Sequence, residues 1–379
     1  SQNQIEPRQE FNKDGDGLDT IKLLVLYSVE NRQPVAFSKQ PGNIPDKISL
    51  ANALRQLDML DLASPVIVAD NGFYSQDNMT HFAREHTKFL MLANSTDKWV
   101  RSEIDAAREE LGHFRNVCPF DVDVSGVMRR RQHGFSIVRK RTRGHFEAGE
   151  TESFTRRLYV HVFHKPEAAP IQERRLRESL FSLKKDLEDG VEEFRPAAQK
   201  QIDSYLTVKR TAKGVKVDFK MDGIEEAKRY WGYFVLVSNE IKDPFDALKA
   251  YRSREKIEEL FATYKDSFDG RKPRTWYPEN LYGRQFAQFV GLGYHCFLAK
   301  RILDVKKALS EKETEGKTKE ELSLEAKLLA WLNQHSLIQI LDWFRCVDYI
   351  AATGNASASK WTTETTRRDQ LFLKMLGVK

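Results

Sequence analysis

A buried strand that runs straight into a carboxylate constrains this chain most. Residues 66–69 read Val-Ile-Val-Ala and lead directly into Asp70, which is followed by Asn-Gly-Phe-Tyr. Four apolar residues in succession are typical of a strand that is covered on both faces of an α/β sheet. A polar turn directly after such a strand lies at the edge where open α/β sheets bind ligands. The segment therefore predicts an α/β fold with Asp70 at a ligand-binding edge.

Strand and helix patterns alternate around this segment. Apolar-rich stretches at 20–29 and 34–39 predict two strands joined by a turn, and leucines at helical spacing predict a helix from Asp46 to about residue 62. Further along, a helix is expected over 75–85 and a strand over 88–92. This alternation predicts a mixed α/β sheet.

The character of the sequence changes between residues 96 and 225. Short strand-like runs at 134–138, 158–162 and 214–220 alternate with turn residues and charges, and a charged helix is predicted over 171–187. Because segments typical of the sheet domain lie on both sides, we interpret residues 96–225 as a β-rich insertion.

The C-terminal part is mainly helical in pattern. A strong β run at 230–238 precedes a helix opened by Asp243 and Pro244. A long apolar helix follows at about 283–303. A charge-rich helix is expected at 306–327, with a loop near Gly316, and a last short helix at 367–376. The stretch at 337–349 is apolar enough to pack on the core.

One predicted helix, from Tyr251 to Lys265, carries polar groups that suit metal-dependent phosphate chemistry. At about 100° per residue four of them fall within roughly 60° of one another. These are Tyr251, Arg254, Glu258 and Lys265. An adjoining apolar stripe would dock the helix on a core, and consists of Ile257, Leu260, Phe261 and Tyr264. Arg254 and Glu258 also have the spacing of an ordinary i,i+4 ion pair, so periodicity alone leaves a solvated helix as an alternative.

The spacing of these four residues resembles a known signature. Tyr, two residues, Arg, three residues, Glu, six residues and Lys is the pattern of the DDE transposases of bacterial insertion sequences, in the branch marked by Tyr-Arg-Glu-Lys. In that family the second catalytic Asp lies in an Asp-x-Gly-Phe/Tyr turn, which Asp70 and its successors match. Further matches are Pro41-Gly42-Asn43 with Asp46, and Trp231-Gly232-Tyr233-Phe234-Val235.

The resemblance implies a fold and a domain order. The expected fold is α/β, an RNase H-like mixed sheet flanked by helices and interrupted by a largely β insertion, with a helical C-terminal region. Residues 1–95 would form the first part of the catalytic domain and 96–225 the insertion. The second part, with the signature helix, would span 226–300, and the helical region 301–379.

The resemblance also implies a catalytic site. Family members hold two Mg²⁺ ions, for which Mn²⁺ can substitute, on three acidic residues, and Asp70 and Glu258 match two of these. Arg254 and Lys265 would contact phosphates near the scissile bond. Tyr251 would donate to a phosphate oxygen or pack beneath a strand end.

The first acidic residue of the family has no match in this sequence. It belongs on a strand that precedes a segment like residues 11–17, so we expect it upstream of Ser1. Asp14, Asp16 and Asp19 are poor substitutes, because they lie in a glycine-rich turn rather than on a strand.

Two basic clusters suggest contact with a phosphate backbone. The net charge of +6 is a weak argument, but residues 129–143 hold seven Lys/Arg and no acid. The candidates here are Arg129, Arg130, Arg131, Arg139 and Arg141. A second basic cluster follows the signature helix and contains Arg271, Lys272 and Arg274. A solvated charged face is the alternative for the first cluster.

Two functions from different classes follow. The first is a DNA transposase, an endonuclease and strand-transfer enzyme that cuts element ends and joins them to target DNA, with double-stranded DNA as partner and a homodimer as the family's synaptic unit. The second is a catalytically inactive, transposase-derived DNA-binding protein. A related nuclease that never joins strands is a third reading.

The sequence has no apolar run of the roughly 18 residues that a membrane span needs. Its three scattered cysteines fit a reducing cytoplasm, and a bacterial or archaeal nucleoid is the expected location.

Overall fold

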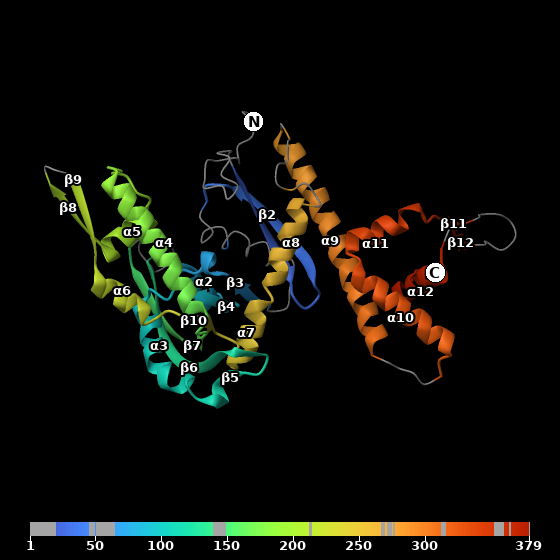
Figure 1. Ribbon diagram of the computed structural model, residues 1–379, viewed down its shortest axis with the longest axis horizontal. Coiled ribbons are helices and arrows are strands. Elements are labelled where there is room, and N and C mark those ends of the chain that lie inside the picture. The colour runs from blue at the N-terminus through green and yellow to red at the C-terminus, as the bar shows by residue number, and fades with distance from the viewer. Residues whose placement is uncertain are drawn as a thin grey trace. The chain divides into compact units, whose positions relative to one another are not determined.

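The computed structural model (Figure 1) describes residues 20–44, 50, 65–138, 149–211, 214–266, 270, 275, 277–311, 316–351, 360–363 and 365–378. The chain divides into two compact units, one formed by Ile44–Glu255 and the other by Ser1–Asn43 together with Lys256–Lys379. Asp14, Asp16 and Asp19 lie outside the described residues, as does nearly all of the helix predicted from Asp46.

A mixed six-stranded sheet organises the first of these units. Its strands are β3 (Val66–Ala69), β4 (Lys88–Ala93), β5 (Val117–Cys118), β6 (Asp121–Val138), β7 (Thr151–His164) and β10 (Tyr233–Ser238). Their order is β3-β4-β10-β7-β6-β5. β3 and β4 are parallel, as expected for strands joined by a crossover helix, and the other neighbours are antiparallel.

Helices cover both faces of this sheet. On one face, α2 (Gln76–Arg84) and α3 (Lys98–Leu111) pack over alternate strand residues such as Phe89 and Met91. On the other face, α7 (Pro244–Arg252) packs over the intervening ones, including Leu90. β4 is apolar from Phe89 to Ala93 because both sides of the strand are covered. The predicted strands at 66–69 and 88–92 and the helix at 75–85 are confirmed.

The segment 96–225 supplies strands to this same sheet. The runs predicted as short strands at 134–138 and 158–162 belong to β6 and β7, which pair without interruption from Ser125↔His164 to Val138↔Thr151. Strands at these two positions are confirmed, but they are much longer than predicted. The polar and charged residues that flank the apolar runs also take part in the strand pairing.

The rest of this segment forms a satellite with its own small core. It comprises α4 (Ala168–Glu188), α5 (Pro196–Tyr205), the hairpin β8 (Leu206–Thr211) with β9 (Gly214–Phe219), and α6 (Met221–Lys228). Leu180, Leu183, Ile202 and Leu206 are buried within it. The predicted helix at 171–187 and the strand at 214–220 are confirmed.

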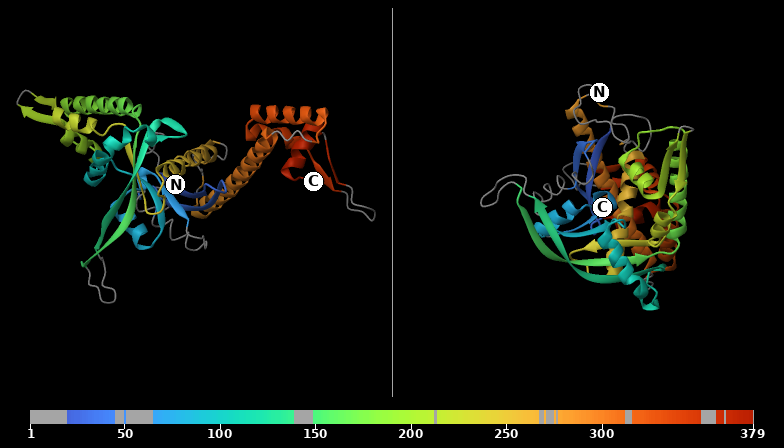
Figure 2. Two further views of the ribbon diagram at one scale, coloured as in Figure 1. Left: turned by 90° about the horizontal axis from the view of Figure 1, so that it is seen from below. Right: turned by 90° about the vertical axis from the view of Figure 1, so that its left-hand side faces the viewer.

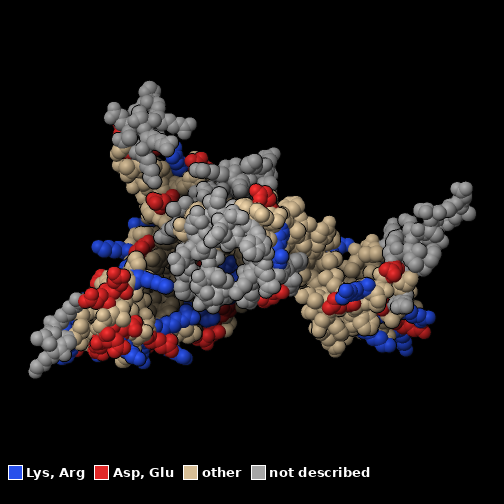
Figure 3. Space-filling model, turned by 90° about the horizontal axis from the view of Figure 1, so that it is seen from above, with Lys and Arg blue, Asp and Glu red and all other residues tan. Residues whose placement is uncertain are grey.

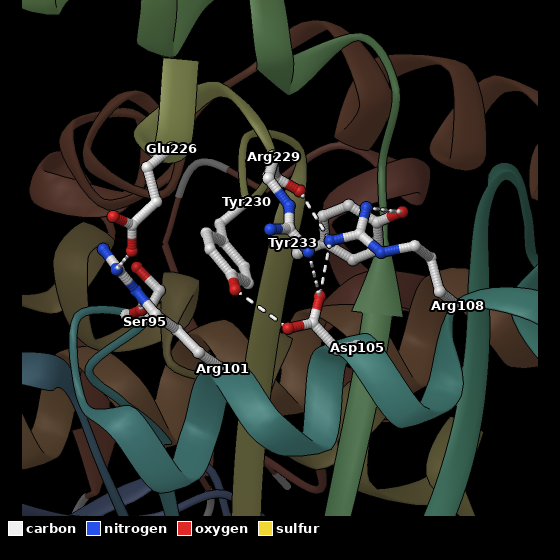
Figure 4. Close-up of polar contacts among 8 residues, drawn as sticks. All are labelled: Ser95, Arg101, Asp105, Arg108, Glu226, Arg229, Tyr230 and Tyr233. Carbon is white, nitrogen blue, oxygen red and sulfur yellow. Dashed lines mark hydrogen bonds and ion pairs between the residues drawn. The ribbon is translucent and has the colours of Figure 1, made fainter. Parts of the chain in front are cut away.

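A polar cluster ties α3 to the turn between α6 and β10 (Figure 4). The Asp105 carboxylate accepts a hydrogen bond from Tyr230 Oη at 2.9 Å and one from Arg108 Nη2 at 3.0 Å, and Arg229 Nη2 lies 3.6 Å away. Burial raises the pKa of Asp105, but the hydrogen bonds from Arg108 and Tyr230 outweigh it and leave the pKa below its ordinary value. Arg101 lies over the Tyr230 ring, 4.7 Å from its centroid. The cluster therefore fixes the start of β10 against α3.

In the second unit, a hairpin packs on two helices. β1 (Ile21–Ser28) and β2 (Gln33–Pro41) form a two-stranded sheet of their own. Leu23 and Val25 of this hairpin pack against Leu260 of α8 (Glu255–Asp266) and Leu292 of α9 (Pro278–Ser310). The predicted strand pair is confirmed, and the apolar stripe expected on the signature helix is buried at Leu260 and Tyr264. The helix expected at 283–303 exists but is longer.

The remaining helices surround a separate core in the same unit. They are α10 (Lys319–Gln334), α11 (Leu337–Trp343) and α12 (Arg367–Leu376), joined by the short η3 (Phe344–Cys346) and the strands β11 (Tyr349–Ala351) and β12 (Lys360–Thr362). Thr318, Ser336 and Thr366 cap the three helices in capping boxes. Leu328, Trp331 and Phe372 are buried between them. Gly316 lies in a left-handed turn before α10, at the loop predicted there.

The architecture is a mixed α/β sheet flanked by helices with a helical C-terminal region, consistent with an RNase H-like fold, as predicted. Among the described residues, none of the helices combines the length and the apolarity that crossing a bilayer requires.

Candidate active site

Asp70 stands at the carboxyl end of β3, at the edge predicted from the sequence. It caps the short helix η1 (Asn71–Phe73), and its Oδ1 accepts the backbone N–H of Asn71 at 2.7 Å. The turn behind it is held by the buried Asn78 of α2, whose Nδ2 donates to the Phe73 carbonyl at 2.7 Å. Tyr74, also buried, donates to Asp97 Oδ2 at 2.9 Å. These contacts fix the backbone around a carboxylate whose side chain is 48% exposed.

Two residues of the predicted signature converge on this carboxylate. Tyr251 Oη donates to Asp70 Oδ1 at 2.9 Å, and Arg254 Nη1 lies 2.7 Å from Oδ2. The guanidinium also lies over the Tyr251 ring, 4.9 Å from its centroid. Tyr251 is buried, whereas the Arg254 side chain is 34% exposed. The structure therefore brings Tyr251 and Arg254 to Asp70, which lies about 180 positions before them in the sequence.

The signature does not lie on one continuous helix, contrary to the prediction. α7 ends at Arg252, Ser253 and Arg254 form a turn, and α8 starts at Glu255. Ser253 Oγ donates to the Ala250 carbonyl at 2.5 Å, a local bond of the kind by which serine competes with helical pairing. The turn leaves Arg254 outside both helices, and its side chain reaches Asp70.

Both ends of α7 are anchored. Asp243 accepts the N–H groups of Phe245 and Asp246 at 2.8 and 2.9 Å, which caps the helix as the Asp-Pro start predicted. At the other end, Arg252 forms an ion pair with Asp121, whose side chain is only 17% exposed. The hydrogen bond from Arg252 is the main cause that lowers the pKa of Asp121. Sequence reasoning missed this pair, because nothing in the local pattern of either residue indicates a partner 131 positions away.

Glu258 and Lys265 both lie on α8 and are exposed. They are seven residues apart, about two helical turns, so they share a face of α8. α8 belongs to the second unit from Lys256 on, whereas Asp70, Tyr251 and Arg254 belong to the first.

The donor chemistry of Asp70 and Glu258 fits a hard divalent cation, because carboxylate oxygens are what Mg²⁺ and Mn²⁺ prefer. Within the part of the chain that the structure describes, no group of three His, Cys, Asp or Glu side chains could hold a metal ion. Asp70 and Glu258 would each contribute one carboxylate.

The predicted basic cluster divides between two environments. Arg129 Nε and Arg131 Nη1 lie 3.0 and 2.7 Å from the two carboxylate oxygens of Glu103, which is 12% exposed on α3. Arg130 is exposed between them. Arg139, Arg141, Arg271, Lys272 and Arg274 lie outside the described residues.

Comparison with known proteins identifies the family. Residues 4–280 match the family model described as a transposase DDE domain, and this span holds Asp70 and the whole signature. No match was found among curated proteins. Because the matched span is well over half of the chain, the chain belongs to the transposase DDE domain family.

Proposed function

We propose that this protein is a DNA transposase of the Tyr-Arg-Glu-Lys branch, which cuts element ends and joins them to target DNA. The observation that carries the proposal is the convergence of Tyr251 and Arg254 on Asp70 at the end of β3. Periodicity alone left open an ordinary ion pair on a helix, but this contact links the signature to the Asp-x-Gly-Phe turn. Family membership supports the same reading.

Asp70 and Glu258 would hold the divalent metal. When bound, two Mg²⁺ ions supply an activated oxygen nucleophile and charge stabilisation at the leaving oxygen. The chain's own residues then have separate tasks. Asp70 places its carboxylate on the rigid turn behind β3, and Glu258 places its own on the exposed face of α8.

Arg254 and Lys265 would bind phosphates beside the scissile bond. Arg254 is partly exposed and its guanidinium is held by Asp70, so the side chain is positioned before any DNA arrives. Lys265 is exposed on the face of α8 that carries Glu258. Tyr251 is buried beneath Arg254 and would keep the Asp70 carboxylate oriented through its hydroxyl. Double-stranded DNA would be the substrate, in a homodimeric synaptic complex at the nucleoid.

The test is nicking of DNA that contains the element ends, with Mg²⁺ or Mn²⁺, by the natural protein and by Asp70→Asn and Glu258→Gln. We expect metal-dependent nicking that either substitution abolishes. Unchanged nicking in Asp70→Asn would remove Asp70 from the site, and unchanged nicking in Glu258→Gln would remove Glu258.

A second candidate is a DNA-binding protein without catalysis. It is favoured by the engagement of both Asp70 oxygens with protein donors, from Asn71, Tyr251 and Arg254. This candidate predicts salt-sensitive DNA binding that Asp70→Asn leaves unchanged, with no cleavage under either metal. The same nicking experiment therefore separates the two candidates.

A further inference from the structure

The hairpin of β6 and β7 has two chemically different faces. Figure 2 shows the two strands running on together beyond the rest of the sheet. Alternate residues point to opposite sides of a strand, and residues directly opposite in the register share a side. One face holds Arg129, Arg131 and the buried His133 and Phe135, and lies against α2 and α3. We call the other side the open face.

Every described residue of the open face from Arg130 to the end of the hairpin is exposed, except Tyr159. On β6 these are Arg130, Gln132, Gly134, Ser136 and Val138, and on β7 they are Thr151, Ser153, Thr155 and Arg157. This set contains no acidic residue, two arginines, one amide and four hydroxyls. At Gly134 an added Cβ would meet nothing within 4 Å, so no described residue covers the middle of the face.

The open face continues the side of the sheet on which α7 lies. α7 covers this side as far as Gly126, where Phe245 of the helix lies 3.2 Å from the position of an added Cβ. Beyond that point the strand residues Arg130 and Gln132 are exposed. α7 also carries Tyr251, so a ligand lying along the open face lies on the same side of the sheet as the candidate active site.

Among the residues that the structure describes, the two arginines of this face have no acidic partner. In the register Arg130 is paired with Tyr159, and Arg157 is paired with Gln132. The arginines are therefore diagonal neighbours on adjacent strands, a position at which Cα atoms are typically about 7–8 Å apart. Neither forms an ion pair with any residue that the structure describes, whereas Arg129 and Arg131 on the opposite face both bind Glu103. The positive charge of the open face is therefore available to a ligand.

We propose that the open face of the β6–β7 hairpin binds duplex DNA along its phosphate backbone, through Arg130, Arg157 and the neighbouring hydroxyl and amide donors. This inference rests on the proposed function and specifies a surface for its substrate. Arg, Ser, Thr and Gln are among the side chains that donate to phosphates, and a two-stranded ribbon is narrow enough to enter a major groove. Arg157, Gln132, Ser153 and Thr155 were not predicted from the sequence.

Charge complementarity distinguishes this face from the other basic surface nearby. On α4 three of the five basic residues are paired along the helix, in Arg174–Glu178, Arg177–Glu173 and Lys184–Glu188. Figure 3 shows Lys and Arg interspersed with Asp and Glu over the satellite that contains α4. A surface of mixed sign attracts a polyanion far less than one that is free of acid.

The experiment is a titration of a fluorescein-labelled 30-base-pair duplex of random sequence with the full chain, without divalent metal, over a range of salt concentrations. The test variant is Arg130→Gln with Arg157→Gln. The matched control is Arg156→Gln with Arg175→Gln, which removes two exposed arginines, one from the other face of β7 and one from α4. Thermal unfolding followed by circular dichroism checks that both variants fold.

We expect the test variant to bind on the order of 10- to 100-fold more weakly at 0.1 M salt, and the slope of log K against log salt to fall by about 2. The control should keep the affinity and slope of the natural protein. The inference is overturned by unchanged binding in the test variant, or by an equal loss in the control. If the natural protein binds no duplex at all, the proposed function falls together with the inference, whereas unchanged binding in the test variant removes the inference alone.

Discussion

Two carboxylates on opposite faces of the same sheet each bind arginine, and they differ in burial. Glu103 on α3 is 12% exposed and lies between Arg129 and Arg131, on the side covered by α2 and α3. Asp70 is 48% exposed at the end of β3 and binds Arg254 and Tyr251, on the side of α7. A carboxylate locked between two arginines serves the packing of a helix. An exposed one that stands at a strand end remains accessible to a ligand.

The comparison teaches that charge pairing does not by itself separate a structural cluster from a functional one. The same arginine-rich run supplies Arg129 and Arg131 to the structural cluster and Arg130 to the open face. What separates them is the alternation of a β-strand, which sends neighbours to opposite sides of the sheet.

The largest expected effects come from neutralising each carboxylate in turn. Asp70→Asn should lower metal-dependent nicking by at least about 10³-fold, while the unfolding free energy changes by less than about 1 kcal/mol, because its ion pair is solvated. Glu103→Gln should lower the unfolding free energy by about 1–3 kcal/mol, because two partly buried guanidiniums lose their ion pair with Glu103. Nicking assays and urea unfolding of both variants measure this. The comparison breaks if the two variants show the same pattern.

The second prediction concerns pH and the α7 side of the sheet. His161 of β7 is fully buried, and its Nε2 lies 3.1 Å from the Ile241 carbonyl, just before α7. Burial lowers the pKa of His161 to about 4, against the opposing effects of that hydrogen bond and of Asp243. In the unfolded chain the same imidazole takes up a proton near pH 6.5. The contribution of the neutral His161 to the free energy of unfolding is therefore fully present above pH 6.5. It is lost as the pH drops towards 4, and the loss amounts to about 3 kcal/mol in total.

The measurement is urea unfolding at several pH values between 4.5 and 7.5 for the natural protein and for His161→Gln. The variant should lose distinctly less stability on acidification. His113→Gln, which removes an exposed imidazole, should follow the natural protein. Parallel curves for all three proteins would contradict the assignment of this loss to His161.

A smaller effect is expected at the anchor of the site cluster. Asp121→Asn removes the charge that holds Arg252 at the end of α7, so Tyr251 and Arg254 lose part of their positioning. We expect nicking to fall by about tenfold with DNA affinity unchanged, and Asp121→Glu to recover most of the rate. Asp123→Asn, at an exposed carboxylate two residues further on, is the control. Equal loss of binding and rate would instead indicate a general loss of structure.

The sequence predicted the strands and helices around Asp70 well, because apolar runs and turn residues are local signals. It also paired Asp70 with the Tyr-Arg-Glu-Lys signature, although only through a resemblance. The break at Ser253 was missed, because helical periodicity continues through it and the Arg254–Asp70 contact that accompanies the break is long-range. The open face was missed for a related reason: Arg157 stands alone in its segment and acquires meaning only through its register with β6.

We propose that the Asp70 carboxylate holds a catalytic metal ion, and a change of ligand tests this most directly. Asp70→Cys replaces a hard oxygen with a softer thiolate, which Mg²⁺ binds poorly and Mn²⁺ tolerates better. We predict that this variant does not nick element-end DNA with Mg²⁺ and regains measurable nicking with Mn²⁺, while Glu103→Gln nicks with both. Nicking by Asp70→Cys with Mg²⁺ at the rate of the natural protein would contradict the claim.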